Sequence, residues 1–131
     1  MQYVTLVCDD DEDISFIEEA IVAQPGHFAI KTFRSANMVL HHLLRLDDDG
    51  FPCLIIINNN LPDMDSLELL EKIKKNPLHK LIPVAIMAGF TSQNSIKQYY
   101  RAGANCYYKK PLDHHEWNHM IDCLITLFCP G

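Results

Sequence analysis

The fold of this chain is decided by residues 53–66, which read CLIIINNNLPDMDS. The apolar run over 53–57 ends at Asn58, and a polar segment that contains Pro62 follows. A short apolar run bounded by turn-forming residues is typical of a strand buried in a parallel sheet. The stretch therefore predicts a central strand over 53–57, with a loop that begins at Asn58.

Similar apolar runs recur along the chain, and segments of helical period separate them. The expected strands lie near 3–8, 28–33, 53–57, 82–87 and 105–109. Apolar runs that alternate with helical patterns predict repeated strand–helix units and a parallel sheet. Five such units, with no linker or internal repeat between them, predict a single α/β domain over residues 1–131.

Five helices are expected after these strands. They lie near 12–23, after Ser35, over 67–75 with Ser66 as N-cap, from Ser92 or Ser95 to 102–103, and after Asp113. Ser and Asp are favoured at N-caps because their side-chain oxygen accepts a hydrogen bond from a free backbone N–H of the first turn. Asp113 and Glu116 have the spacing of a capping box, and apolar residues from Trp117 to Phe128 follow at helical spacing.

Three features at the strand ends resemble response-regulator receiver domains in combination. The acidic pair Asp9–Asp10 follows the first strand, Asn58 lies four residues before Pro62, and Lys110–Pro111 follows the fifth strand. The resemblance covers nearly the whole chain. It implies a flavodoxin-like (βα)5 fold with a five-stranded parallel sheet in the order 2-1-3-4-5, and ligands at the carboxyl ends of the strands.

The resemblance also implies roles for individual positions. In the family, the residue matching Asn58 is the aspartate that accepts a phosphoryl group from a histidine kinase, and Lys110 matches a charge-stabilising lysine. Ala88 falls where the family has a Ser or Thr, and Tyr107 matches an aromatic switch position. An amide cannot form an acyl phosphate, and an alanine has no hydroxyl to follow one. We therefore expect a degenerate receiver that does not use the ordinary aspartate phosphorylation.

Asp9 and Asp10 are the candidate metal ligands. Two carboxylates at one edge of the sheet suit a hard cation such as Mg²⁺, but Asn58 replaces the third expected carboxylate. Weak Mg²⁺ binding is expected, with no cofactor required. The alternative is that the acidic residues only cap the next helix and favour its positive end. Lys110 is expected to pair with a carboxylate of this pocket.

Two other functions remain open at this point. The first is a receiver with an unusual phosphoacceptor, since Asp63 and Asp65 lie in the loop after Asn58, although at a different spacing from the strand. The second is a zinc metalloprotease, because HEWNH at 115–119 matches HExxH. The capping box already explains the glutamate of that motif, and no clear third ligand follows. We therefore expect no enzymatic activity, and at most zinc chelation by the two histidines, which are four residues apart.

Composition excludes several classes of function. The formal net charge is −6 and no segment clusters Lys and Arg with aromatic residues, so nucleic acid is not an expected ligand. The longest apolar runs have about five residues, far fewer than the roughly 20 of a membrane helix. The amino-terminal segment MQYVTLV carries no signal-peptide pattern. Five cysteines without a CxxC pair indicate reduced thiols in a cytoplasmic protein, with Cys129 the most exposed.

Output is expected to pass through protein contacts, with no attached output domain. The expected partner is a histidine kinase or a downstream signalling protein of a two-component phosphorelay, and a homodimer is a further possibility. Large side chains outside the core stripe mark a contact surface on the fourth helix, the fifth strand and the last helix. Its members are Tyr99, Tyr100, Tyr107, Cys123 and Leu127.

Overall fold

The computed structural model describes residues 2–130, apart from the side chain of Asp48. Its strands are β1 (Tyr3–Val7), β2 (Ala29–Phe33), β3 (Leu54–Asn58), β4 (Val84–Ala88) and β5 (Cys106–Lys109). They form one parallel sheet in the order β2-β1-β3-β4-β5, which confirms the expected fold. The apolar run of residues 53–57 thus supplies the central strand, which is buried along its whole length.

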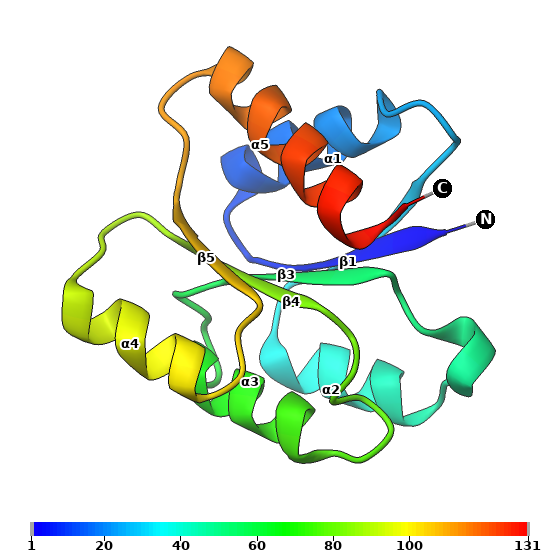
Figure 1. Cartoon of the computed structure of the whole chain (residues 1–131), viewed down its shortest axis with the longest axis vertical. Coiled ribbons are helices and arrows are strands. Elements are labelled where there is room, and N and C mark those ends of the chain that lie inside the picture. The colour runs from blue at the N-terminus through cyan, green and yellow to red at the C-terminus, as the bar shows by residue number, and fades with distance from the viewer. Residues whose placement is uncertain (1, 131) are drawn as a thin grey trace.

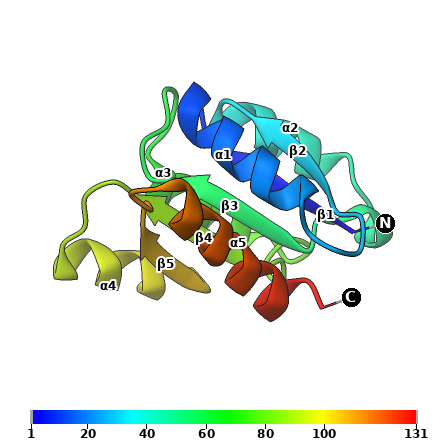
Figure 2. The same cartoon turned by 90° about the horizontal axis from the view of Figure 1, so that it is seen from above.

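The helices cover both faces of this sheet. They are α1 (Asp11–Val22), α2 (Ala36–Leu44), α3 (Ser66–Lys75), α4 (Gln93–Arg101) and α5 (His114–Phe128), with a short 3-10 turn, η1 (Asp48–Gly50). Figure 1 shows α1 and α5 on one face and α2, α3 and α4 on the other. From above, α1 and α5 lie side by side over the strands (Figure 2), and they share one apolar core with the inner residues of β1 and β3.

Most helix starts follow the expected N-cap chemistry. Ser35 accepts a hydrogen bond from the N–H of Met38, Ser92 accepts from Ser95, and Asp113 accepts from Glu116. Each bond satisfies a backbone donor that the helix itself leaves free. None of the helices over residues 2–130 has the length and apolar character needed to span a membrane.

The expected cap of α3 is wrong by one residue. Asp65, not Ser66, is the N-cap, and its carboxylate accepts from the N–H of Leu67 at 3.0 Å. Ser66 is fully buried, and its hydroxyl donates to the backbone oxygen of Asn58 at 2.6 Å. The buried hydroxyl satisfies an acceptor at the end of β3, which leaves the exposed Asp65 to cap the helix.

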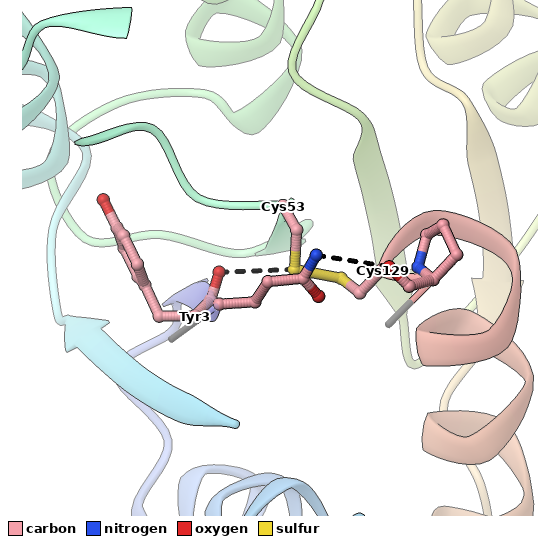
Figure 3. Close-up of a disulfide and its surroundings, with 5 residues drawn as sticks. Tyr3, Cys53 and Cys129 are labelled. Carbon is pink, nitrogen blue, oxygen red and sulfur yellow. Dashed lines mark hydrogen bonds between the residues drawn. A yellow bond between two sulfur atoms is a disulfide. The ribbon is translucent and has the colours of Figure 1, made fainter. Parts of the chain in front are cut away.

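The expectation of five reduced cysteines is also wrong. Cys53 and Cys129 form a disulfide across 76 residues, with their Cα atoms 5.4 Å apart, a separation that suits a disulfide. Figure 3 shows the bridge between the segment before β3 and the end of α5. The backbone N–H of Cys53 also donates to the backbone oxygen of Tyr3 at 3.0 Å. Cys129 is buried, contrary to the prediction that it is the most exposed cysteine. Its position against β3 depends on the packing of α5, which no local pattern encodes.

Candidate functional site

The carboxyl ends of adjacent strands bring the predicted pocket residues to one edge of the sheet. Asp9 follows β1, Asn58 ends β3, Ala88 ends β4 and Lys110 follows β5. Backbone hydrogen bonds fix these ends together: the N–H of Asn59 donates to the oxygen of Met87, and the N–H of Lys110 donates to the oxygen of Ala88, both at 2.8 Å. The shared edge was expected from the resemblance, and parallel strands in this order produce it.

Lys110 pairs with a carboxylate that the sequence reasoning did not single out. Its ammonium lies 2.6 Å from a carboxylate oxygen of Asp13, and the two side chains are only 24% and 12% exposed. The expected partners were Asp9 and Asp10, which are both exposed. Asp13 lies in the first turn of α1, four residues after Asp9, and this spacing was the signal that could have identified it.

Asn58 is buried at the end of β3. It is 3% exposed, and its amide nitrogen donates to the backbone oxygen of Asn60 at 3.3 Å. Its amide oxygen is buried and has no hydrogen-bond partner among the described residues. The position therefore offers one neutral acceptor where a phosphorylatable residue needs a charged oxygen nucleophile.

The acidic residues after β1 serve mainly to begin α1. Asp10 is the N-cap, and its carboxylate accepts from the N–H of Asp13 at 2.9 Å. Arg34 pairs with Asp11 at 2.7 Å and donates to the backbone oxygen of Asp9 at 3.4 Å. Asp10 thus has the helix-capping role that was kept as the alternative to metal binding.

These residues fit a divalent cation poorly. Within residues 2–130, no group of three or more His, Cys, Asp or Glu side chains is arranged to hold a metal ion. The carboxylate of Asp10 caps a helix, that of Asp13 binds Lys110, and position 58 carries an amide. The exposed carboxylate of Asp9 and the neutral amide oxygen of Asn58 are a weak ligand set for a hard cation, which prefers several charged oxygen ligands.

Cys8 is a pocket residue that the sequence reasoning treated only as core. It is fully buried at the end of β1, and its thiol lies 3.9 Å from the backbone oxygen of Asp10. Burial raises the pKa of the Cys8 thiol, the nearby Asp13 raises it further, and Lys110 opposes the rise. A neutral thiol therefore lies close to the Lys110–Asp13 pair. Its place directly before Asp9 was the available signal.

Tyr107 is a half-buried residue of β5 that packs against α4. Its hydroxyl is 3.4 Å from that of Ser95, its ring centroid is 5.4 Å from that of Tyr99, and its N–H donates to the hydroxyl of Tyr100. Tyr99 is only 6% exposed, so the expectation that it lies on an exposed contact surface is wrong. Tyr99 fills the seam between α4 and β5, where burial, Asp65 and Tyr107 raise its pKa to about 12.

Three members of the expected contact surface do face solvent. Tyr100 is 47% and Leu127 is 68% exposed, and Cys123 is exposed as a free thiol. Two large apolar side chains near the pocket edge, Phe90 and Leu112, are also exposed and were not anticipated.

The alternative acceptors after β3 both have structural roles. The carboxylate of Asp63 accepts from the N–H groups of Ala36 and Asn37, each at 2.9 Å, and these backbone bonds lower its pKa. Asp65 caps α3. Neither carboxylate lies at a strand end, where Lys110 and the acidic segment meet.

The HExxH segment is the start of α5. The N–H of Glu116 donates to Asp113, and its carboxylate accepts from the N–H of Leu112 at 2.9 Å. Glu116 is therefore engaged in capping the helix, although its backbone partner is Leu112 and not the N-cap residue of an ideal capping box. His115 and His119 are exposed on α5.

Comparison with known proteins places this geometry in a family. Residues 5–122 match the response regulator receiver domain. The chain belongs to the response-regulator receivers. These domains act in two-component signalling, and they are generally signalling modules without enzymatic activity.

Two curated relatives show the extent of the similarity. The chain is 37% identical over 110 residues to response regulator Rcp1 of Synechocystis sp., which covers 82% of this chain and 75% of Rcp1. It is 32% identical over 120 residues to the DNA-binding transcriptional regulator NtrC of Proteus hauseri, which covers 92% of this chain. The chain spans only 24% of the length of NtrC.

Solved structures agree with this placement. The phosphorylated cyanobacterial phytochrome response regulator RcpA superimposes with a TM-score of 0.90 at 25% identity, over 98% of this chain and 94% of RcpA. The Mn²⁺-bound form of Rcp1 superimposes with a TM-score of 0.87 at 22% identity, over 100% of this chain and 97% of that chain.

Proposed function

We propose that this receiver works in a two-component pathway through protein contacts, without phosphorylation of residue 58. The observation that carries the proposal is the buried amide of Asn58 at the end of β3, on the same sheet edge as a Lys110 that is already bound to Asp13. Phosphoryl transfer needs an anionic oxygen acceptor, and a neutral amide cannot form an acyl phosphate.

The Lys110–Asp13 pair supports this proposal independently. A lysine that stabilises charge on a transferred phosphoryl group must be able to approach it. Here the ammonium contacts a carboxylate of α1 at 2.6 Å, and the two side chains are mostly buried. The Lys110 ammonium neutralises the carboxylate of Asp13. The fold therefore needs neither a metal ion nor a phosphoryl group to pair these two charges.

We further propose that Ala88 removes the switch itself. Ala88 is fully buried at the end of β4 and has no hydroxyl with which to bind a phosphoryl oxygen. Tyr107 is meanwhile held by Ser95, Tyr99 and Tyr100 in the seam beside α4. A single arrangement of the α4–β5–α5 face is therefore available for recognition, by a histidine kinase or by a downstream signalling protein.

The decisive experiment is incubation with acetyl phosphate and Mg²⁺, followed by intact-mass analysis. The mass of the wild-type chain is expected to remain unchanged. In a second measurement, Asn58→Asp restores a charged oxygen ligand and is expected to bind Mg²⁺ more than about tenfold more tightly than the wild type does. Isothermal titration measures that affinity. A stoichiometric acyl phosphate on the wild-type chain would refute the proposal and show that another residue is the acceptor.

The contact surface has its own test. Replacing Tyr100 and Leu127 with glutamate is expected to weaken capture of a purified partner kinase or regulator by more than about tenfold, since exposed apolar side chains commonly anchor interfaces. The matched control changes Leu81 and Leu44, which are 84% and 70% exposed but lie outside α4, β5 and α5. Equal losses in both double variants would place the interface elsewhere.

A further inference from the structure

One face of α5 carries side chains of metal-binding types that take no part in the site around Asn58 and Lys110. His115, His119, Cys123 and Leu127 follow one another at intervals of four residues, and all four are exposed. Residues four apart lie above one another on one face of a helix. The core stripe of α5, with Trp117, Ile121, Leu124 and Ile125, faces the sheet and α1 instead.

Two of these side chains already have the spacing of a metal chelate. The Cys123 sulfur lies 3.8 Å from Nε2 of His119. Zinc binds Cys sulfur at about 2.3 Å and His nitrogen at about 2.0–2.1 Å, so a tetrahedral angle places the two ligand atoms about 3.6 Å apart. The pair therefore needs little rearrangement to hold one ion. A thiolate and an imidazole favour Zn²⁺ over the hard cation Mg²⁺.

Within one chain this site is incomplete. No group of three or more ligating side chains is arranged for a metal in residues 2–130, and closed zinc sites usually have four protein ligands. A second copy related by a two-fold axis supplies the same pair again, because such an interface places the same surface of both subunits against itself. We propose that one Zn²⁺ ion joins two copies of this chain through His119 and Cys123 of each.

The neighbouring side chains suit this arrangement. Leu127 lies one turn beyond Cys123 and is 68% exposed, so a second α5 laid across the site would cover it. Binding displaces one proton from each thiol and changes no oxidation state, since Zn²⁺ has no redox chemistry. The site uses neither Asn58 nor Lys110, so the proposal goes beyond the proposed function and does not depend on it.

The experiment measures the mass of the assembly by sedimentation equilibrium as ZnCl₂ is added. It is carried out in deoxygenated buffer without a thiol reductant, so that the Cys53–Cys129 disulfide stays intact. Zinc is expected to convert monomer to dimer at one ion per two chains, and EDTA is expected to reverse the change. With Co²⁺ in place of zinc, a thiolate-to-metal charge-transfer band is expected in the ultraviolet.

Variants identify the ligands. Cys123→Ser and His119→Gln are each expected to weaken zinc-dependent dimerisation more than about tenfold. The matched control is His115→Gln, on the same face one turn earlier, which is expected to behave as wild type. All three positions are exposed, and circular dichroism establishes that the variants fold.

Three outcomes would overturn the proposal. Zinc could leave the chain monomeric at concentrations that saturate ordinary His–Cys sites. The dimer could resist EDTA but dissociate with a reductant, which would indicate a disulfide between two copies of Cys123. Finally, His115→Gln could abolish binding while Cys123→Ser does not, which would assign the metal to the two histidines of the HExxH segment.

Discussion

At the scale of single residues, the chemistry of the site at the strand ends depends on the functional group that each side chain carries. Asn58 has no carboxylate and Ala88 has no hydroxyl, whereas Lys110 pairs with Asp13 of α1. A partly buried ion pair contributes little net stability, but the loss of one member leaves an uncompensated charge. Lys110 and Asp13 are therefore expected to be more sensitive to substitution than Asp9 or Asp10.

Asp13→Asn tests this pair. The change keeps the shape of the side chain and leaves Lys110 without its counter-charge, so the free energy of unfolding is expected to fall by about 1–3 kcal/mol. Urea denaturation followed by circular dichroism measures it. The matched control is Asp11→Asn, which breaks an exposed pair with Arg34 and is expected to cost less than about 1 kcal/mol. Equal losses would show that the Lys110–Asp13 contact is no stronger than a surface pair.

Tyr99 provides a prediction at high pH. Burial holds its pKa near 12 in the folded chain against 10.0 for a free tyrosine, so the unfolded state loses its proton first as the pH rises. The stabilising contribution of neutral Tyr99 is complete below pH 10 and is lost between pH 10 and about 12. Tyr99→Phe is therefore expected to show a shallower loss of stability over this interval, measured by urea denaturation at several pH values. An unchanged slope would mean that Tyr99 ionises as it does in the unfolded chain.

At the scale of elements, the end of α4 depends on a close contact with α3. Gly103 follows the C-cap of α4 with φ of 108°, and a Cβ atom there would lie 2.9 Å from Cγ of Lys74. The Lys74 ammonium cannot move freely, because it donates to the backbone oxygens of Lys80 and Ile82 and to the side-chain oxygen of Asn105. One lysine thus connects α3, the approach to β4 and the start of β5.

Gly103→Ala is expected to lower the free energy of unfolding by about 1–2 kcal/mol, because an L-residue is disfavoured at positive φ and the added methyl displaces Lys74. Thermal and urea denaturation measure the loss. Gly89→Ala is the matched control: its φ is not in the left-handed region, and its nearest neighbour lies 3.9 Å away. The explanation fails if the two variants are equally stable.

At the scale of the whole molecule, the disulfide fixes the last helix to the central strand. Cys53 directly precedes β3 and Cys129 directly follows α5, so the bridge joins the sheet to the last helix (Figure 3). The loop that it closes spans 76 residues of the chain. A cross-link over so long a loop reduces the conformational entropy of the unfolded chain. Reduction of this disulfide is therefore expected to lower the free energy of unfolding of the whole domain.

Cys53→Ser combined with Cys129→Ser removes the bridge without leaving a new free thiol. For a separation of 76 residues, loop entropy predicts a loss of about 4.5 kcal/mol in the free energy of unfolding. Urea denaturation of the oxidised wild type and of the double variant measures the difference. The control is Cys106→Ser, a half-buried free cysteine, for which reductant is expected to lower stability as it does in the wild type. A wild-type chain that reductant leaves equally stable would show that the bridge does not form in solution.

Local sequence was sufficient to predict the strands, most helix starts and the absence of a carboxylate at position 58. Strand and helix periods, N-caps at Ser35, Ser92 and Asp113, and the amide at Asn58 are all properties of short segments. They could be predicted because apolar periodicity and side-chain-to-backbone hydrogen bonds act over a few residues.

The tertiary structure alone decided which side chains meet. It pairs Lys110 with Asp13, buries Tyr99 against Tyr107 and joins Cys53 to Cys129. The ion pair and the disulfide connect residues far apart along the chain, whereas Tyr99 and Tyr107 lie on the neighbouring elements α4 and β5. All three contacts depend on how each helix packs against the sheet. The amide at position 58 is thus a property of the chain alone, and it supplies no anionic oxygen. The Lys110–Asp13 ion pair forms only in the folded molecule, because α1 carries a carboxylate to within hydrogen-bonding distance of the lysine after β5.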